Sequence, residues 1–324
     1  MNWRIPRLFR IRRGRAPEAR AWPWLVLFAA AVAVGIGCVF WFMREAMRNE
    51  RMAERQRLAD AYRSHVALLQ TYLAEAARTG AAQLDGNEPP PVWFLACVQS
   101  QRASSAIIRN SAGAILYPID TIDAEPSAKA QQLQADARAL VTAGKADEAI
   151  DLIVSTTAAP EFGDAFDAQG RLVAASLELF AAQLMKSAEH PQFGGVARRL
   201  TQRANDYAHV RMPSSQRRFV MRELQRLAPA STHFPTLAAE DYAAHYLEAG
   251  TVAKASGFQR TGLAGLWQLV SSSGNVIGLF TTEELRKRFD AVLKGAPQLG
   301  GARVDLVAPG EERMAHQAAL VSVP

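Results

Sequence analysis

The chain has 324 residues, with 37 lysines and arginines against 31 acids and a formal net charge of +6. Its first 21 residues hold seven arginines and a single acid, Glu18, so this tail carries a charge equal to that of the whole chain. Beyond Ala21 the basic and acidic residues balance. No basic patch remains of the kind that binds DNA or RNA, and we expect no nucleic-acid partner.

Residues 22–43 (WPWLVLFAAAVAVGIGCVFWFM) contain no charge. As a helix they would be roughly 33 Å long, close to the hydrocarbon thickness of a bilayer. Trp22 and Trp24 stand at one end and Trp41 at the other, where indole rings prefer the headgroup level. This segment predicts a transmembrane helix.

The arginine-rich tail predicts the orientation of this span. Positive charge stays on the cytoplasmic side, so residues 1–21 are expected in the cytoplasm and everything after 43 outside the inner membrane. A cleaved signal peptide would need a shorter apolar run and a small-residue cleavage site, whereas residues 42–45 read FMRE. Cys38 lies in the span and Cys97 outside it, so we expect no intramolecular disulfide in the exported part.

Residues 44–85 predict a stalk helix that continues out of the membrane. Its first half alternates in charge, and its second half carries an apolar seam at spacings of four and three residues: Leu58, Tyr62, His65, Leu69, Tyr72 and Ala76. The seam is explained equally well by packing on the domain that follows and by pairing with a second copy of the stalk. The second explanation implies a homodimer.

Two β segments, 86–126 and 251–324, are predicted on either side of a helical section. Each contains a hairpin with an apolar strand, a turn containing serine and glycine, and a second apolar strand: 105–109 with 114–117, and 267–271 with 275–280. Thr281 and Glu284 form a capping-box pattern that predicts a helix ending near 293. Strands are also expected at 302–307 and 318–323.

Residues 127–250 are helical in pattern, with breaks at glycine and proline. The predicted helices are 128–141, 147–155, 167–188, 196–207, 214–227 and 237–247. Residues 137–153 resemble half a tetratricopeptide unit. About three such units are needed to bury a continuous core, so we expect a helical layer rather than a solenoid.

The fold class expected is therefore α+β, with an antiparallel sheet, a large all-helical insertion and a leading transmembrane and stalk helix. The predicted regions are a cytoplasmic tail (1–21), a span (22–43), a stalk (44–85), a first β segment (86–126), a helical section (127–250) and a second β segment (251–324).

No catalytic motif is present: there is no G-x-S-x-G, H-E-x-x-H, Walker loop or C-x-x-C. We expect no metal and no cofactor. A small-ligand pocket lined by apolar groups and a few polar ones is the more plausible site. Five side chains on or beside the predicted strands could line it: Trp93, Arg102, Tyr117, Arg260 and Trp267.

The layout resembles the extracytoplasmic sensor region of bacterial membrane-bound sensor histidine kinases, and more loosely the Cache/PAS-like sensors. The likeness is carried by the span at 22–43, the stalk at 44–84, the strand–turn–strand at 107–118 and the closing run at 318–324. It implies a ligand- or partner-binding receptor of a two-component system. The chain departs from the family in its long helical section, and the context of His190 does not fit a phosphoacceptor box.

A second hypothesis is a membrane-anchored scaffold of the cell envelope, motivated by the tetratricopeptide-like unit. Its helical section would be a docking surface for an envelope protein, and the span would serve only to localise it.

In receptors of this kind the last strand leads into a second span and then the kinase. We expect the coding DNA beyond Pro324 to continue into an apolar span and a phosphorelay module, which sequencing the downstream reading frame checks. A stop codon directly after Pro324, with no second span, would remove transmembrane kinase signalling.

Overall fold

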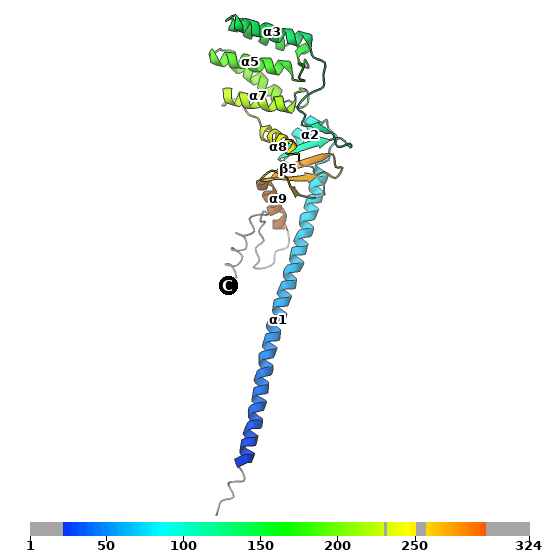
Figure 1. Cartoon of the computed structure of the whole chain (residues 1–324), viewed down its shortest axis with the longest axis vertical. Helices are drawn as coiled ribbons and strands as arrows, with labels where there is room; N and C mark the ends of the chain where they lie inside the picture. Colours follow the sequence, from blue (N-terminus) through cyan, green and yellow to red (C-terminus); the bar gives the residue numbers. More distant parts are fainter. Residues whose placement is uncertain (1–21, 230–231, 251–256, 296–324) are drawn as a thin grey trace, which may run out of the picture. The chain divides into compact units, whose positions relative to one another are not determined.

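The computed structural model describes residues 22–229, 232–250 and 257–295 (Figure 1). The chain divides into two units, Met1–Leu68 and Leu69–Pro324. The first helix, α1 (Trp22–Gln83), begins in the first unit and ends in the second. The strands expected at 302–307 and 318–323 lie outside the described residues.

Helix α1 covers both the predicted span and the predicted stalk as one element of 62 residues. Pro23 does not interrupt it, because a proline in the first turn removes an N–H that has no helical partner anyway. Its N-terminal part is long and apolar enough to cross a membrane, and none of that apolar stretch is buried inside the protein. Of the seam, Leu69 is buried, whereas Leu58 and Tyr62 are exposed.

The second unit contains an antiparallel sheet of five strands in the order β2-β1-β5-β4-β3. The strands are β1 (Ser105–Arg109), β2 (Ile115–Tyr117), β3 (Gln259–Arg260), β4 (Leu266–Val270) and β5 (Val276–Thr281). Both predicted hairpins are confirmed as β1–β2 and β4–β5. They join through β1 and β5, with Ser105 opposite Leu279 and Ile108 opposite Val276. Strand β3 was not predicted.

Successive side chains along a strand point to opposite faces of the sheet, and here both faces are buried. One face includes Ile108 and Phe280 and packs with the end of α1 and with α2 (Pro90–Gln99). The other includes Ile107 and packs with α8 (Leu237–Glu248), whose Tyr246 belongs to the same cluster. The sheet is therefore covered by helices on both sides.

Helix α2 lies within the predicted first β segment, 86–126, in which strands were placed only at 105–109 and 114–117. Pro90 and Pro91 occupy its first turn, where their fixed φ favours a helix start. Its apolar residues Trp93, Phe94 and Cys97 lie on one buried side. No element was predicted for the apolar run 92–98, which lies in this helix.

All six predicted helices of the helical section are present. Their bounds are α3 (Ala128–Thr142), α4 (Ala146–Thr157), α5 (Val173–Ser187), α6 (Phe193–Asn205), α7 (Ser214–Leu227) and α8, with a short 3₁₀ turn at Pro160–Phe162. The start of α5 was placed too early, at 167. The Asp167 carboxylate instead accepts the N–H groups of Gln169 and Arg171, both at 2.9 Å, and holds a turn ahead of the helix.

Each helix from α3 to α7 packs on the next, and α5 also contacts α3 and α7. Figure 1 shows α3, α5 and α7 stacked in one row. Helix α5 is enclosed on most sides and buries nine residues, from Val173 to Met185. The section is thus a stack in which each helix packs on its neighbours along the chain.

Helix α9 (Thr282–Gly295) follows β5 directly and confirms the predicted capping. The Glu284 N–H donates to Thr281 Oγ1 at 3.2 Å. The Glu284 carboxylate pairs with Arg288, whose guanidinium lies over the Phe280 ring at 4.9 Å. This ties the helix back to the sheet.

We predict that Leu84→Ala lowers the free energy of unfolding by about 2–5 kcal/mol, because the removed side chain leaves a void in the core. Leu84 is fully buried in the cluster that includes Trp93 and Phe280. Leu68→Ala, at a position 39% exposed, is the matched control and should cost less. Urea unfolding followed by tryptophan fluorescence measures both, and equal losses would contradict this packing.

Candidate functional site

A cavity of about 430 Å³ lies where the start of α2, the chain after β2 and the α6–α7 connection meet. This volume falls in the range of small-ligand sites. The lining residues are Pro89, Pro91, Tyr117, Ile119, Thr121, Ile122, Asp123, Tyr207, Ala208, Val210, Arg211, Met212 and Arg217. We call it the sensor cavity, after the role proposed for it below.

A buried carboxylate, Glu240 on α8, lies behind the wall of the sensor cavity. It accepts hydrogen bonds from the hydroxyls of Tyr117 and Ser214, and from the Tyr207 hydroxyl at 2.8 Å. Tyr207 also lies 2.9 Å from the Thr236 hydroxyl. Strand β2, the α6–α7 connection, α7 and α8 thus converge on one carboxyl group.

Burial controls the protonation of this cluster. Loss of solvation raises the pKa of Glu240 above its ordinary value, although the Ser214 and Tyr117 hydroxyls and the charge of Arg217 act in the opposite direction. Burial, followed by the neighbouring Glu240, also raises the pKa of Tyr117 and of Tyr207. The interior beside the cavity therefore favours uncharged, proton-bearing groups.

Arg217 brings a positive charge to this interior while only 1% exposed. Its guanidinium lies over the Tyr207 ring at 4.0 Å and donates to the carbonyls of Ala204, at 2.5 Å, and Val210, at 3.1 Å. Its Nε is buried and has no hydrogen-bond partner among the described residues. A buried donor without a partner is costly to the fold.

A second guanidinium, that of the exposed Arg211, also lines the cavity and lies over the Phe166 ring at 5.5 Å. The lining otherwise holds one acid, Asp123, and many apolar side chains such as Ile122 and Met212. Two cations beside an apolar wall suit a small ligand with an anionic group and an apolar part.

The five predicted site residues are not brought together. Tyr117 lines the sensor cavity, but its hydroxyl is committed to Glu240. Arg102 lies over the Trp93 ring at 4.9 Å, and Arg260 over the Trp267 ring at 5.8 Å, so these four form two separate pairs. Trp93 is on a helix and not on a strand.

Sequence reasoning missed Arg211, Ser214, Arg217 and Glu240. A signal for two of them was present, because Arg217 and Glu240 fall on the buried faces of α7 and α8 among apolar neighbours. A charged residue on the apolar face of a helix indicates either a paired interior group or a site.

The Trp93–Arg102 pair lies at the end of α1. The Trp93 indole N–H donates to the Leu84 carbonyl at 2.9 Å, and Arg102 donates to the Gln83 carbonyl at 3.2 Å. The β4–β5 turn adds a bond from the Ser272 N–H to the Ala81 carbonyl at 3.2 Å. Carbonyls at the end of α1 thus accept hydrogen bonds from α2, from Arg102 in the loop after it and from the β4–β5 turn.

The same β4–β5 turn binds Asp85, the second residue after α1. The carboxylate of Asp85 accepts from the hydroxyl of Ser273, at 2.5 Å, and from its N–H, at 3.2 Å. The end of α1 is therefore bonded to the module that contains the sensor cavity.

Among the described residues, no group of three histidines, cysteines or acids is placed to hold a metal ion. Cys38 and Cys97 are both free thiols, and burial raises the pKa of Cys97 to about 11. Comparison of the chain with protein-family models, with curated proteins and with solved structures finds no match.

We predict that Glu240→Gln changes the pH dependence of stability. Below about 4.5, the ordinary pKa of a glutamate, Glu240 is protonated in both the folded and the unfolded chain. As the pH rises above that value the unfolded chain releases this proton and the folded chain keeps it, so unfolding becomes easier. The wild type should lose stability with rising pH relative to the variant until its folded pKa is passed.

Urea unfolding of both proteins at a series of pH values measures this difference. The variant has an amide that does not titrate, and the remainder of the pH profile is shared. Parallel curves would show that Glu240 titrates alike in the folded and unfolded chains, contrary to its burial.

Proposed function

We propose that the chain is the extracytoplasmic sensory part of a membrane-bound signalling receptor. In this proposal residues 22–43 span the inner membrane with the N-terminus in the cytoplasm, and the sensor cavity takes a small organic anion. The resemblance to sensor histidine kinases, with a Cache/PAS-like sheet, suggests that the output is a two-component phosphorelay.

The observation that carries this proposal is the short path of contacts from the cavity to α1. Tyr117, in the cavity wall, packs on Phe94 of α2 with ring centroids 4.8 Å apart. The preceding residue, Trp93, donates its indole N–H to the carbonyl of Leu84, which directly follows α1. A ligand that moves Tyr117 would thus displace α2, and α2 is bonded to the helix that leads to the membrane.

Signalling by this route needs two states that the ligand binds with different affinity. Small shifts of a helix against a neighbouring helix are a common way to couple such states to an output. The exposed Leu58 and Tyr62 of the seam provide an apolar surface for a second stalk, so we include a homodimer in the proposal.

The first test is ligand binding by the 324-residue chain in lipid nanodiscs. Acetate, succinate, benzoate and phosphate are added singly, and the unfolding temperature is measured. We expect at least one organic anion to raise it and the increase to disappear in Arg211→Gln, which removes an exposed charge of the cavity lining. Arg198→Gln, an exposed charge on α6 outside the cavity, is the matched control. No stabilisation by any of these anions would contradict an anion site.

The second test follows transmission. In a Cys38→Ser background, Tyr62→Cys reports stalk pairing through the rate of disulfide formation between two copies. The stabilising anion should change this rate, and Trp93→Phe should abolish the change, because phenylalanine keeps the packing but loses the N–H that binds Leu84. An unchanged rate with bound ligand would contradict the receptor.

The scaffold alternative is favoured by one observation, the stack of helices α3 to α7. Replacing residues 22–43 with an unrelated span distinguishes the two functions. The scaffold should tolerate this exchange, whereas the receptor should lose its response to the ligand.

A further inference from the structure

A second cavity, of about 330 Å³, lies on the helical section across α3, α5 and α7. It shares no lining residue with the sensor cavity. Helix α3 contributes Gln134 and Arg138 to one side, α5 forms the floor, and α7 contributes Phe219 to the other side. We call this cavity the helix groove.

The groove has an apolar part. Phe219 is 56% exposed, although it is a large aromatic side chain on a helix that packs into the core on its other face. Phe180 of α5, half-buried, lines the groove as well. Two phenylalanines in one groove provide an apolar surface that a partner side chain could cover.

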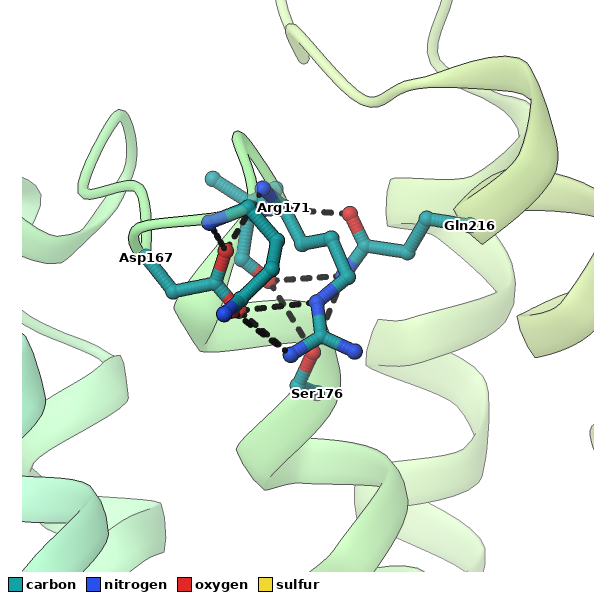
Figure 2. Close-up of polar contacts among 6 residues, drawn as sticks. Asp167, Arg171, Ser176 and Gln216 are labelled. Atoms are coloured by element: carbon teal, nitrogen blue, oxygen red, sulfur yellow. Dashed lines mark hydrogen bonds and ion pairs between the residues drawn. The ribbon is translucent and has the colours of Figure 1, made fainter. Parts of the chain in front are cut away.

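The groove also has a cationic part, of which Arg171 is the fixed member. Its guanidinium is bonded to the Asp167 carboxylate at 2.8 Å while its side chain stays half exposed (Figure 2). Asp167 in turn accepts backbone N–H groups, so the carboxylate, the turn and the guanidinium hold one another in place.

Gln216 of α7 secures this turn from the opposite side, as Figure 2 shows. Its buried amide accepts the Leu172 N–H and donates to the Leu172 carbonyl, both at 2.8 Å, and reaches the Ser176 hydroxyl at 3.0 Å. An arginine held in this way loses little conformational freedom when it binds an anion.

Arg138 supplies the second positive charge. It is exposed on α3, and no acid of the described residues lies within ion-pair distance of it. With Asp167 balancing Arg171, the groove keeps a net positive charge beside its apolar part.

We propose that the helix groove docks an acidic stretch of a partner polypeptide. Carboxylates of the partner pair with Arg138 and Arg171, and an adjacent apolar side chain covers Phe219. Gln134 can both donate to and accept from a peptide backbone, as an extended chain requires. A nucleic acid would need a longer basic surface than two arginines. This site is independent of the sensor cavity and its ligand.

The test uses the 324-residue chain in nanodiscs and a fluorescein-labelled library of short peptides in which glutamates alternate with phenylalanine or leucine. We expect binding that weakens as salt is added, because the charges are exposed. Arg138→Gln and Arg171→Gln should each weaken binding about tenfold, the loss of one charge-assisted contact. Phe219→Ser should weaken it as well.

Asp167→Asn tests the positioning of Arg171. This variant keeps Arg171 but removes the negative charge that pairs with its guanidinium. It should therefore weaken peptide binding less than Arg171→Gln does, and binding should still depend on salt. Arg198→Gln is the matched control, since it removes an equivalent exposed charge outside the groove. Circular dichroism verifies that each variant is folded.

Three results would overturn the proposal. They are no binding of any acidic peptide, equal binding of a library with lysine in place of glutamate, and equal weakening by Arg198→Gln and Arg138→Gln. Competition by free glutamate as strong as that by the peptides would assign the groove to a small anion instead.

Discussion

The close contact of Leu84 with Gly278 is the contact on which the packing of the second unit depends. Gly278 lies in β5, the central strand of the sheet, and a Cβ added there would come within 2.8 Å of Leu84 Cδ1. Only a glycine lets the end of α1 approach the middle of the sheet this closely. The β4–β5 turn and α2 then bond the same helix end from two sides.

The pairing of β1 with β5 explains how one sheet can hold a long helical insertion. These strands are distant in sequence, and their pairing brings the chain before and after the helical section together. Glu240 reinforces this closure, because it joins β2, α7 and α8 through hydroxyl groups inside the protein. The sensor cavity lies at this junction, where a ligand would contact both the insertion and the sheet.

Local signals were enough to predict much of this fold. Pro213 marks the start of α7, and the bounds predicted for this helix, 214–227, agree with the structure. The capping pattern at Thr281 and the two hairpin turns likewise predicted the start of α9 and the pairing of neighbouring strands. Helix α2 was not predicted, because the short apolar run after Pro90 and Pro91 fits a buried strand as well as a helix. No local sequence pattern indicates that β1 pairs with β5.

The sites were harder to predict than the fold. Tyr117 and Glu240 are 123 positions apart, so no spacing in the sequence connects them. The predicted aromatic and arginine side chains did form pairs, but these pairs secure α1 and β3 instead of lining a cavity. One signal in the sequence could have indicated the site: Arg217 and Glu240 lie on helix faces that are otherwise largely apolar.

The stacked arrangement of the helical section has an evolutionary consequence. Helices α3 and α4 pack chiefly on each other and on α5, away from the strands. A pair of helices could therefore be gained or lost at that end without altering the sheet, the hydrogen bonds to Glu240 or the contact of Leu84 with Gly278. Relatives of this protein would then differ in the length of their insertions while sharing the same core, so the surface of the helical section could change without a change in the sheet.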